Sequence, residues 1–140
     1  MRTIIAGSRT LIDGALVEQG VKECGWQITA VVSGMARGID RLGAAWARRN
    51  NIPVVEFPAQ WVQWGKRAGY IRNALMAENA EALLLIWDGE SKGSAAMLAL
   101  ARDKGLRIHI VIPPKDTPRQ PSITYTWYSK GSQRRRKVDM

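Results

Sequence analysis

The sequence predicts an α/β fold with a doubly wound, mainly parallel five-stranded sheet and helices on both faces. Three observations predict it. Apolar, β-rich runs alternate with amphipathic segments of helical period along the first 112 residues. Small residues with charged neighbours follow several of these runs. One run, Ala82–Trp87, is almost wholly apolar, which is typical of a central parallel strand buried on both faces. Alternating strands and helices build parallel sheets covered on both sides.

The predicted elements follow one another in chain order. Glycine or asparagine stands at the expected helix ends, as at Gly25, Asn50 and Gly105. In the third helix, Leu75 is expected to face inward. We expect strands at residues 2–6, 27–33, 53–57, 82–87 and 106–112, and helices at residues 14–24, 38–50, 68–80 and 94–104.

Composition restricts the class of protein. Hydrophobic residues make up 46% of the 140 residues, which fits one domain with a substantial core. No apolar run reaches the roughly 18 residues of a membrane helix, and the first residues enter a strand rather than a signal peptide. The single Cys24 excludes an internal disulfide and a cysteine-based zinc site, and His109 is expected to be half-buried in a strand. We therefore expect a soluble cytoplasmic protein without metal or cofactor.

Positive charge increases toward the C-terminus. The net charge is +9, and residues 113–140, with seven Lys or Arg and two Asp or Glu, contribute +5 of it. We expect this stretch to be a proline-containing, basic, partly flexible extension of a domain formed by residues 1–112, with a strand over Ile123–Tyr128. The following residues either contact phosphates of a nucleic acid or form a solvated terminus: Arg134, Arg135, Arg136 and Lys137.

The stretch Val31–Asp40 is read as a short strand, a glycine-rich loop and a helix that begins near Gly38. The amides of a first helical turn lack partners within the helix and favour an anion. Gly34 and Ala36 leave room for a ligand, and Arg37 adds positive charge. The pattern matches neither the dinucleotide-binding G-x-G-x-x-G nor a P-loop. The alternative is a tight strand-to-helix connection that binds nothing.

Two further loops, at residues 7–9 and 88–94, also combine small residues with charge after a strand. In doubly wound sheets, ligands bind beyond the carboxyl ends of the strands, where strand order reverses. We expect all three loops to converge there. The stretch 58–67 is irregular and contains Trp61 and Trp64, which either cover a ligand site or pack the loop onto the core.

Four motifs stand in order along residues 3–112: Ala6–Arg9, Ser33–Asp40, Ala68–Met76 and Ser91–Ser94. Together they resemble the SLOG superfamily, the Rossmann-like group named for Smf/DprA and LONELY GUY proteins, and above all its YspA-like branch of bacteria and their phages. The resemblance implies a protein that binds a nucleotide, nucleoside phosphate or nucleotide-derived sugar phosphate at the carboxyl edge of the sheet. Such a protein would act as a sensor, a sequestering protein or a processing enzyme.

The resemblance also implies which residues bind this ligand. Small residues would approach the phosphate and donate to it, four cations (Arg9, Arg37, Arg72 and Lys92) would neutralise it, and Asp40, Asn73 and Asp88 would hold hydroxyls or orient the cations. The full set is Gly7, Ser8, Arg9, Ser33, Gly34, Met35, Ala36, Arg37, Gly38, Asp40, Arg72, Asn73, Asp88, Gly89, Ser91, Lys92, Gly93 and Ser94.

One position departs from the pattern. LONELY GUY phosphoribohydrolases, which cleave a base from a nucleoside monophosphate, carry an acid where this chain has Met97. Met97 shares a predicted helix face with Leu98 and Ala101, which is typical of a core residue. Asp88 and Glu90 are the remaining carboxylate candidates for catalysis, although no spacing requires either. Phosphoribohydrolase-like N-glycosidic cleavage of a nucleotide or an NAD-derived molecule is therefore an alternative to binding alone.

A third hypothesis follows from the DNA-processing proteins of the superfamily, which bind single-stranded DNA and have a loop similar to Ser33–Asp40. Such binding combines a basic groove with aromatic platforms, and the alternative for these aromatics is burial. Candidate DNA-contacting residues are Trp61, Trp64, Lys66, Arg67, Trp127, Tyr128 and Arg134.

The resemblance also implies a homodimer through residues 74–80 and 95–101, unless those faces lie in the chain's own core.

Overall fold

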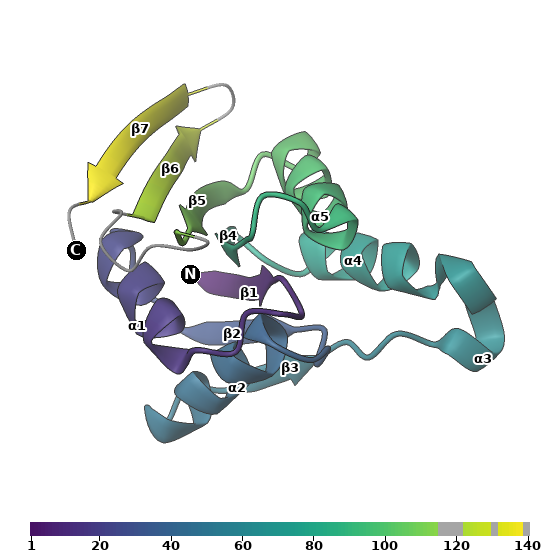
Figure 1. Cartoon of the computed structure of the whole chain (residues 1–140). Helices are drawn as coiled ribbons and strands as arrows, with labels where there is room; N and C mark the ends of the chain where they lie inside the picture. The colour runs from purple at the N-terminus through teal and green to yellow at the C-terminus, as the bar shows by residue number, and fades with distance from the viewer. Residues whose placement is uncertain (115–121, 130–131, 139–140) are drawn as a thin grey trace.

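The computed structural model describes residues 1–114, 122–129 and 132–138, and in the last two stretches it describes the side chain of Thr124 alone. These residues contain one sheet of seven strands in the order β3-β2-β1-β4-β5-β6-β7 (Figure 1). The first five strands in chain order are parallel, as the sequence predicts. They are β1 (Arg2–Gly7), β2 (Ala30–Ser33), β3 (Val54–Glu56), β4 (Ala82–Ile86) and β5 (Arg107–Ile112). The predicted fold class is thus confirmed.

The sheet continues beyond β5 with two antiparallel strands, β6 (Ser122–Ser129) and β7 (Ser132–Val138). The alternation of residues 123–128 predicts β6, whereas nothing in the basic run that forms β7 predicts a strand. Residues 122–129 and 132–138 of the basic extension therefore contribute two strands to the sheet of the first 112 residues. The backbone ladder explains this, because β6 and β7 pair with each other along nearly their whole length. Residues 115–121, 130–131 and 139–140 lie outside the described residues.

Helices cover both faces of the sheet. On one face lie α1 (Gly14–Glu23) and α2 (Ile39–Arg49), and on the other α4 (Ala68–Glu78) and α5 (Lys92–Asp103) (Figure 1). Successive residues of a strand point to opposite faces. In β4, therefore, Leu83 and Leu85 join the core beneath α4 and α5, while Leu84 and Ile86 join the core beneath α1 and α2. None of the helices formed by the described residues is long and apolar enough to span a bilayer.

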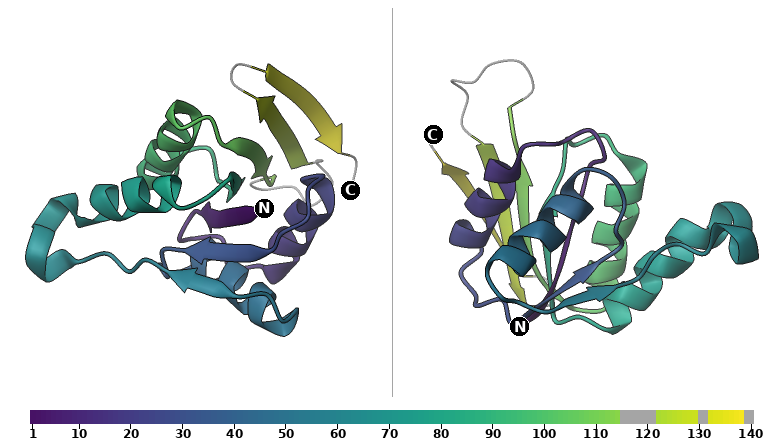
Figure 2. Two further views of the ribbon diagram at one scale, coloured as in Figure 1. Left: turned by 180° about the vertical axis from the view of Figure 1, so that it is seen from behind. Right: turned by 90° about the horizontal axis from the view of Figure 1, so that it is seen from below.

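Residues 58–67 form a projection that we call the arm. It contains the short helix α3 (Trp61–Trp64) and the 3-10 turn η1 (Gly65–Arg67), and it extends away from the sheet in every view (Figures 1 and 2). Trp61 and Trp64 are 53% and 42% exposed, and Val62 is fully exposed. The arm tryptophans are therefore not packed into the core.

Two single-residue expectations are wrong. Leu75 is 45% exposed rather than directed inward, because it lies on the side of α4 that faces the arm, where it shares a hollow with Pro58 and Trp64. His109 is fully buried rather than half-buried, because its side chain lies on the face of β5 that α1 covers. Its Nε2 atom lies 3.8 Å from a carboxylate oxygen of Glu23 in α1.

Candidate functional site

A large hollow lies where strand order reverses, between the loops after β1 and β4. Its volume is about 510 Å³, and α4 and α5 form its far wall. We call it the main cleft. Its lining residues are Ala6, Gly7, Ser8, Arg9, Thr10, Ala36, Asp40, Arg72, Asn73, Met76, Asp88, Glu90, Ser91, Gly93, Ser94 and Met97.

A second hollow of about 270 Å³ adjoins the main cleft, and the two share Arg9, Ala36 and Arg72. We call it the arginine cleft. It lies between the loop after β2 and the beginning of the arm, and its lining comes from four separate segments of the chain. Its lining residues are Arg9, Gly34, Met35, Ala36, Arg37, Arg41, Pro58, Ala59, Trp61 and Arg72.

Most of the predicted ligand-binding residues line one of these two hollows. Four of the eighteen line neither: Ser33, Gly38, Gly89 and Lys92. Sequence reasoning missed Thr10 and Met76 in the main cleft, and Arg41, Pro58 and Ala59 in the arginine cleft. Trp61, which also lines the arginine cleft, fits the expectation that an arm tryptophan covers a ligand site. The spacing of Arg41 from Arg37, one helical turn further on, was the one available signal for this second group.

Ser8 ties together the loops at this edge of the sheet. It is buried, its hydroxyl accepts a 2.9 Å hydrogen bond from the amide of Asp88, and its own amide donates to the Ile86 carbonyl at 3.1 Å. Asp88 in turn accepts hydrogen bonds from the amides of Glu90 and Ser91, both at 2.8 Å. Hydrogen bonds within the protein thus connect the loops that form the floor of the main cleft.

The glycines of the first two loops have a structural reason that does not involve a ligand. A Cβ atom at Gly7 would lie only 1.9 Å from the Ile86 carbonyl oxygen, and at Gly38 2.6 Å from that of Ser8. At Gly34 it would lie 2.4 Å from a guanidinium nitrogen of Arg72. These glycines therefore let the protein's own loops and side chains approach one another.

The loop after β2 also uses its own amides. Met35 donates its amide proton to the Ser33 hydroxyl at 3.1 Å, and Ala36 donates to a carboxylate oxygen of Asp40 at 3.3 Å. The amide of Ile39, the first residue of α2, points to the Ser8 carbonyl at 3.5 Å. Much of the anion-binding capacity expected of this loop is thus satisfied internally.

The loop after β4 differs in this respect. Ser91 caps α5 by accepting a 3.4 Å hydrogen bond from the amide of Ser94. A Cβ atom at Gly93 would meet nothing within 4 Å, although Gly93 lines the main cleft. The first turn of α5 therefore presents open backbone to the cleft, at the positive end of a twelve-residue helix.

Asp40 and Arg72 form the charged centre between the two hollows. Arg72 donates to the Gly34 carbonyl and to the Asn73 side chain, both at 2.8 Å, and so reaches from α4 to the loop after β2. Burial raises the pKa of Asp40 to about 6, opposed mainly by the nearby charge of Arg72. Burial also lowers the pKa of Arg72, while Asp40 raises it and Arg9 lowers it further.

The carboxylate candidates for catalysis take different positions. Asp88 lines the main cleft but its Oδ1 atom is engaged by two amides, and Glu90 lies exposed at the cleft. Met97 is 2% exposed and belongs both to the core and to the cleft lining, which fits its predicted core role. Within the described residues, no three His, Cys, Asp or Glu side chains lie close enough together to hold a metal ion.

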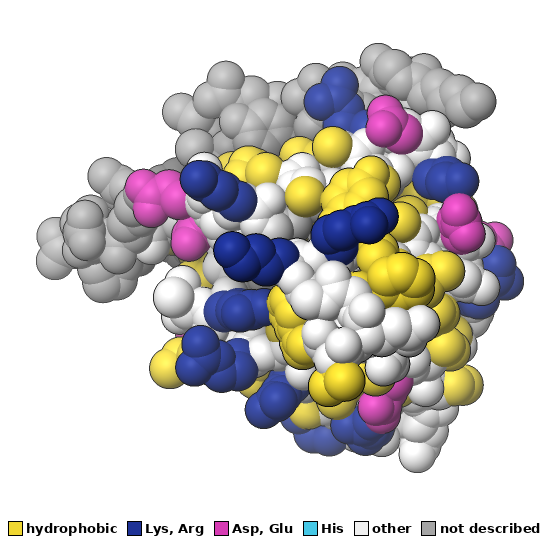
Figure 3. Space-filling view, turned by 90° about the vertical axis from the view of Figure 1, so that its right-hand side faces the viewer, with side chains coloured by type: hydrophobic (Ala, Val, Ile, Leu, Met, Phe, Trp, Pro, Cys, Tyr) yellow, Lys and Arg dark blue, Asp and Glu magenta, His cyan; other side chains and the backbone are white. Residues whose placement is uncertain are grey.

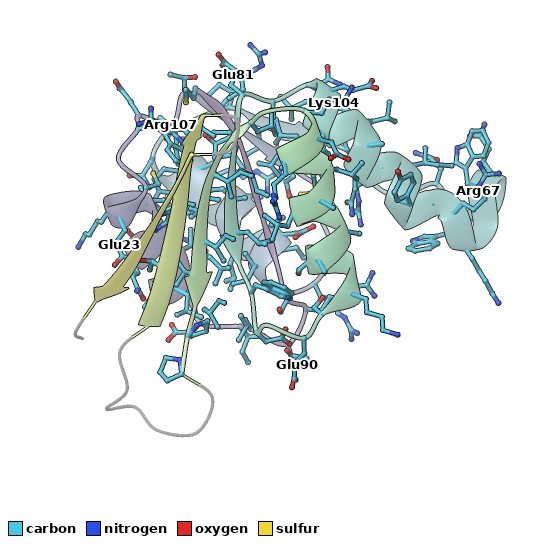
Figure 4. All side chains as sticks on the ribbon, turned by 90° about the horizontal axis from the view of Figure 1, so that it is seen from above. Glu23, Arg67, Glu81, Glu90, Lys104 and Arg107 are labelled. Atoms are coloured by element: carbon cyan, nitrogen blue, oxygen red, sulfur yellow. The ribbon has the colours of Figure 1, made fainter. Side chains whose placement is uncertain are left out.

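The residues proposed for one DNA-binding groove do not lie together. The arm follows β3 at one edge of the sheet, whereas β6 and β7 form the opposite edge. Figure 4 shows the same separation, with Arg67 on the arm far from Glu23 and Arg107 at the other side. Trp61 and Arg67 therefore cannot share a short groove with Arg134, whose side chain lies outside the described set.

Comparison with known families agrees with this geometry. Residues 1–64 match the family model described as YspA, cpYpsA-related SLOG family. Over these 64 of its 140 residues the chain is similar to the SLOG superfamily, in its YspA-like branch. The match covers β1, β2 and the loops that follow them, and it ends before α4 and α5, whose place at the two hollows is given by the structure alone. A search among curated proteins finds no match to the chain.

Proposed function

We propose that the main cleft binds a nucleotide, a nucleoside phosphate or a nucleotide-derived sugar phosphate. The observation that carries the proposal is the lining of this cleft at the point of strand reversal. Three buried polar residues, Ser8, Asn73 and Ser94, line it. The same cleft is lined by the first turn of α5 and by the two cations Arg9 and Arg72. Hydroxyls and amides suit sugar hydroxyls and base edges, while backbone amides and guanidinium groups suit phosphate. The similarity of residues 1–64 to the SLOG family supports the same class of ligand.

A thermal-shift screen followed by calorimetric titration tests this proposal. The screen uses nucleoside mono-, di- and triphosphates, ribose 5-phosphate, ADP-ribose and NAD. A ligand that binds the folded state alone raises the midpoint temperature of thermal unfolding. The positive ligand is then titrated into Gly93→Leu, whose side chain would extend into the open space at the cleft.

Gly14→Leu is the matched control. Gly14 also lies in the first turn of a helix, also has nothing within 4 Å of its Cβ position, and is remote from the cleft. Both changes replace a helical glycine and should raise stability by up to about 1 kcal/mol. We expect at least tenfold weaker binding in Gly93→Leu and wild-type binding in Gly14→Leu. Equal binding in both variants would remove the main cleft as the site.

A second candidate function is N-glycosidic cleavage of the same ligand, favoured by the position of Asp40. It is a buried carboxyl that lines the main cleft, with a pKa of about 6 that suits proton transfer near neutral pH. In this reaction water adds to the anomeric carbon, the bond to the base breaks, and Asp40 gives its proton to the leaving nitrogen and regains one from the water. The products are the free base and the sugar phosphate.

Chromatography of reaction mixtures distinguishes the two candidates. Release of free base by the wild type, lost in Asp40→Asn while the ligand still binds, would establish cleavage. A ligand that binds tightly and is recovered intact after long incubation would leave the protein as a binding protein.

A further inference from the structure

The two hollows differ in charge. The main cleft contains the carboxylates Asp40, Asp88 and Glu90 beside its two arginines. The arginine cleft contains four arginines and no acidic residue among its lining. Carboxylates in a binding site accept hydrogen bonds from hydroxyls, whereas clustered guanidinium groups recognise phosphate. The two hollows are therefore suited to different parts of a ligand.

The arginines of the second hollow are available to an anion. None of Arg9, Arg37 and Arg41 takes part in an ion pair among the residues that the structure describes. Arg41 is oriented by a 3.0 Å hydrogen bond from its Nε to the Met35 carbonyl, and Arg72 by its bond to Gly34. Two of the four guanidinium groups are thus positioned in advance, which lowers the ordering cost of binding.

An aromatic surface borders the same hollow. Trp61 lines the arginine cleft from the arm, and the far end of its ring would be 3.7 Å from a Cβ atom at Gly69 of α4. The side chain is half exposed, so one part of it is supported by α4 and another part is open. An exposed tryptophan beside guanidinium groups is a platform on which a nucleobase can stack.

We propose that the ligand is a dinucleotide that spans both hollows across Arg9 and Arg72. This inference rests on the proposed function, since it places the first nucleotide in the main cleft. The second nucleotide then lies in the arginine cleft, with its phosphate against the four arginines and its base against Trp61. Figure 3 views the molecule from the side toward which β1 points and the arm projects, and Lys and Arg side chains gather on that face while acidic ones lie mostly at its margin.

The test compares mononucleotides with dinucleotides on matched variants. The ligands are the four ribonucleoside monophosphates and the corresponding dinucleotides in 3′–5′ and 5′–5′ linkage, titrated by calorimetry at fixed salt. The test variants are Trp61→Ala and Arg41→Gln, both at exposed positions of the arginine cleft. The controls are Trp64→Ala and Lys66→Gln, which change the other arm tryptophan and an arm cation that do not line it.

We expect one dinucleotide to bind the wild type at least tenfold more tightly than its mononucleotide. Trp61→Ala and Arg41→Gln should each remove most of that difference and leave the mononucleotide affinity unchanged, and the controls should leave both affinities unchanged. Equal affinities for the two ligands, both lost in Gly93→Leu, would overturn the dinucleotide and preserve the proposed function. No binding of either ligand would overturn both.

A single-stranded oligonucleotide provides the last comparison. Binding of a twelve-nucleotide strand that far exceeds dinucleotide binding, falls steeply with salt, and weakens equally in Trp61→Ala and Lys66→Gln would indicate an extended nucleic-acid surface. That result would overturn the dinucleotide proposal.

Discussion

The loops after β2 and β4 look alike in sequence, since each places small residues and charge between a strand and a helix. In the structure they differ. The loop after β2 is closed: its glycines admit Arg72 and the backbone of the β1 loop, and its amides are taken by Ser33 and Asp40. The loop after β4 is open, because Gly93 faces empty space at the main cleft. A glycine-rich turn can thus either make room for the protein's own atoms or leave space for a ligand, and only the neighbouring atoms in the structure distinguish these two roles.

The largest expected effect concerns two glycines with positive φ. Gly38 has a φ of 78° and a crowded Cβ position 2.6 Å from the Ser8 carbonyl oxygen, whereas Gly89 has a φ of 85° and open space. We expect Gly38→Ala to lower the free energy of unfolding by about 3 kcal/mol or more, and Gly89→Ala by about 1 kcal/mol. Urea unfolding followed by tryptophan fluorescence measures both. Equal losses of unfolding free energy in the two variants would mean that the closed loop can move enough to accept the new Cβ atom, and would contradict this prediction.

The second prediction concerns the buried charge of the closed loop. The pKa of Asp40 is raised from 3.8 to about 6, so the folded state favours the neutral carboxyl. The neutral Asp40 carboxyl therefore contributes to the free energy of unfolding in full below pH 3.8, and this contribution is lost as the pH rises through 6. The free energy of unfolding changes by about 3 kcal/mol across this interval. Other acids titrate in this range, so the quantity to measure is the difference in unfolding free energy between wild type and Asp40→Asn. That difference should fall across this pH interval, and a flat difference would place Asp40 in a solvated environment.

Hydroxyl deletion sharpens the comparison further. Ser33 is fully buried, accepts from Met35 and donates to the Asp40 carbonyl at 3.1 Å, whereas Ser91 makes one long capping bond in the open loop. We expect Ser33→Ala to cost about 1–3 kcal/mol and Ser91→Ala about 0.5–1 kcal/mol. A larger cost at Ser91, measured by the same urea unfolding, would reverse the assignment of closed and open loops.

Much of the fold follows from local pattern. Helical and strand periods, and the apolar run of β4, predict the parallel sheet because burial on both faces leaves that mark on the sequence. Strand β7 was not predictable in this way, because a polar edge strand is specified by its partner and not by its own periodicity.

The site was predictable to a different degree. The three converging loops could be foreseen, since parallel strands bring their carboxyl ends to one edge. That part of the predicted residues would line a separate arginine cleft could not be foreseen, because this hollow depends on where the beginning of the arm lies beside the β2 loop, and no periodicity describes that path. The role of Gly34 was likewise hidden, since Arg72, which fills the space beside it, lies 38 residues away.

Amide shifts measured by NMR on ¹⁵N-labelled protein test the central claim most directly. The positive mononucleotide is titrated, and the amide of Gly93 in the open loop is compared with those of Met35 and Ala36 in the closed loop. The account predicts a large shift at Gly93 and small ones at Met35 and Ala36, whose protons are already hydrogen-bonded within the protein. Shifts concentrated at Met35 and Ala36, with Gly93 unchanged, would contradict it.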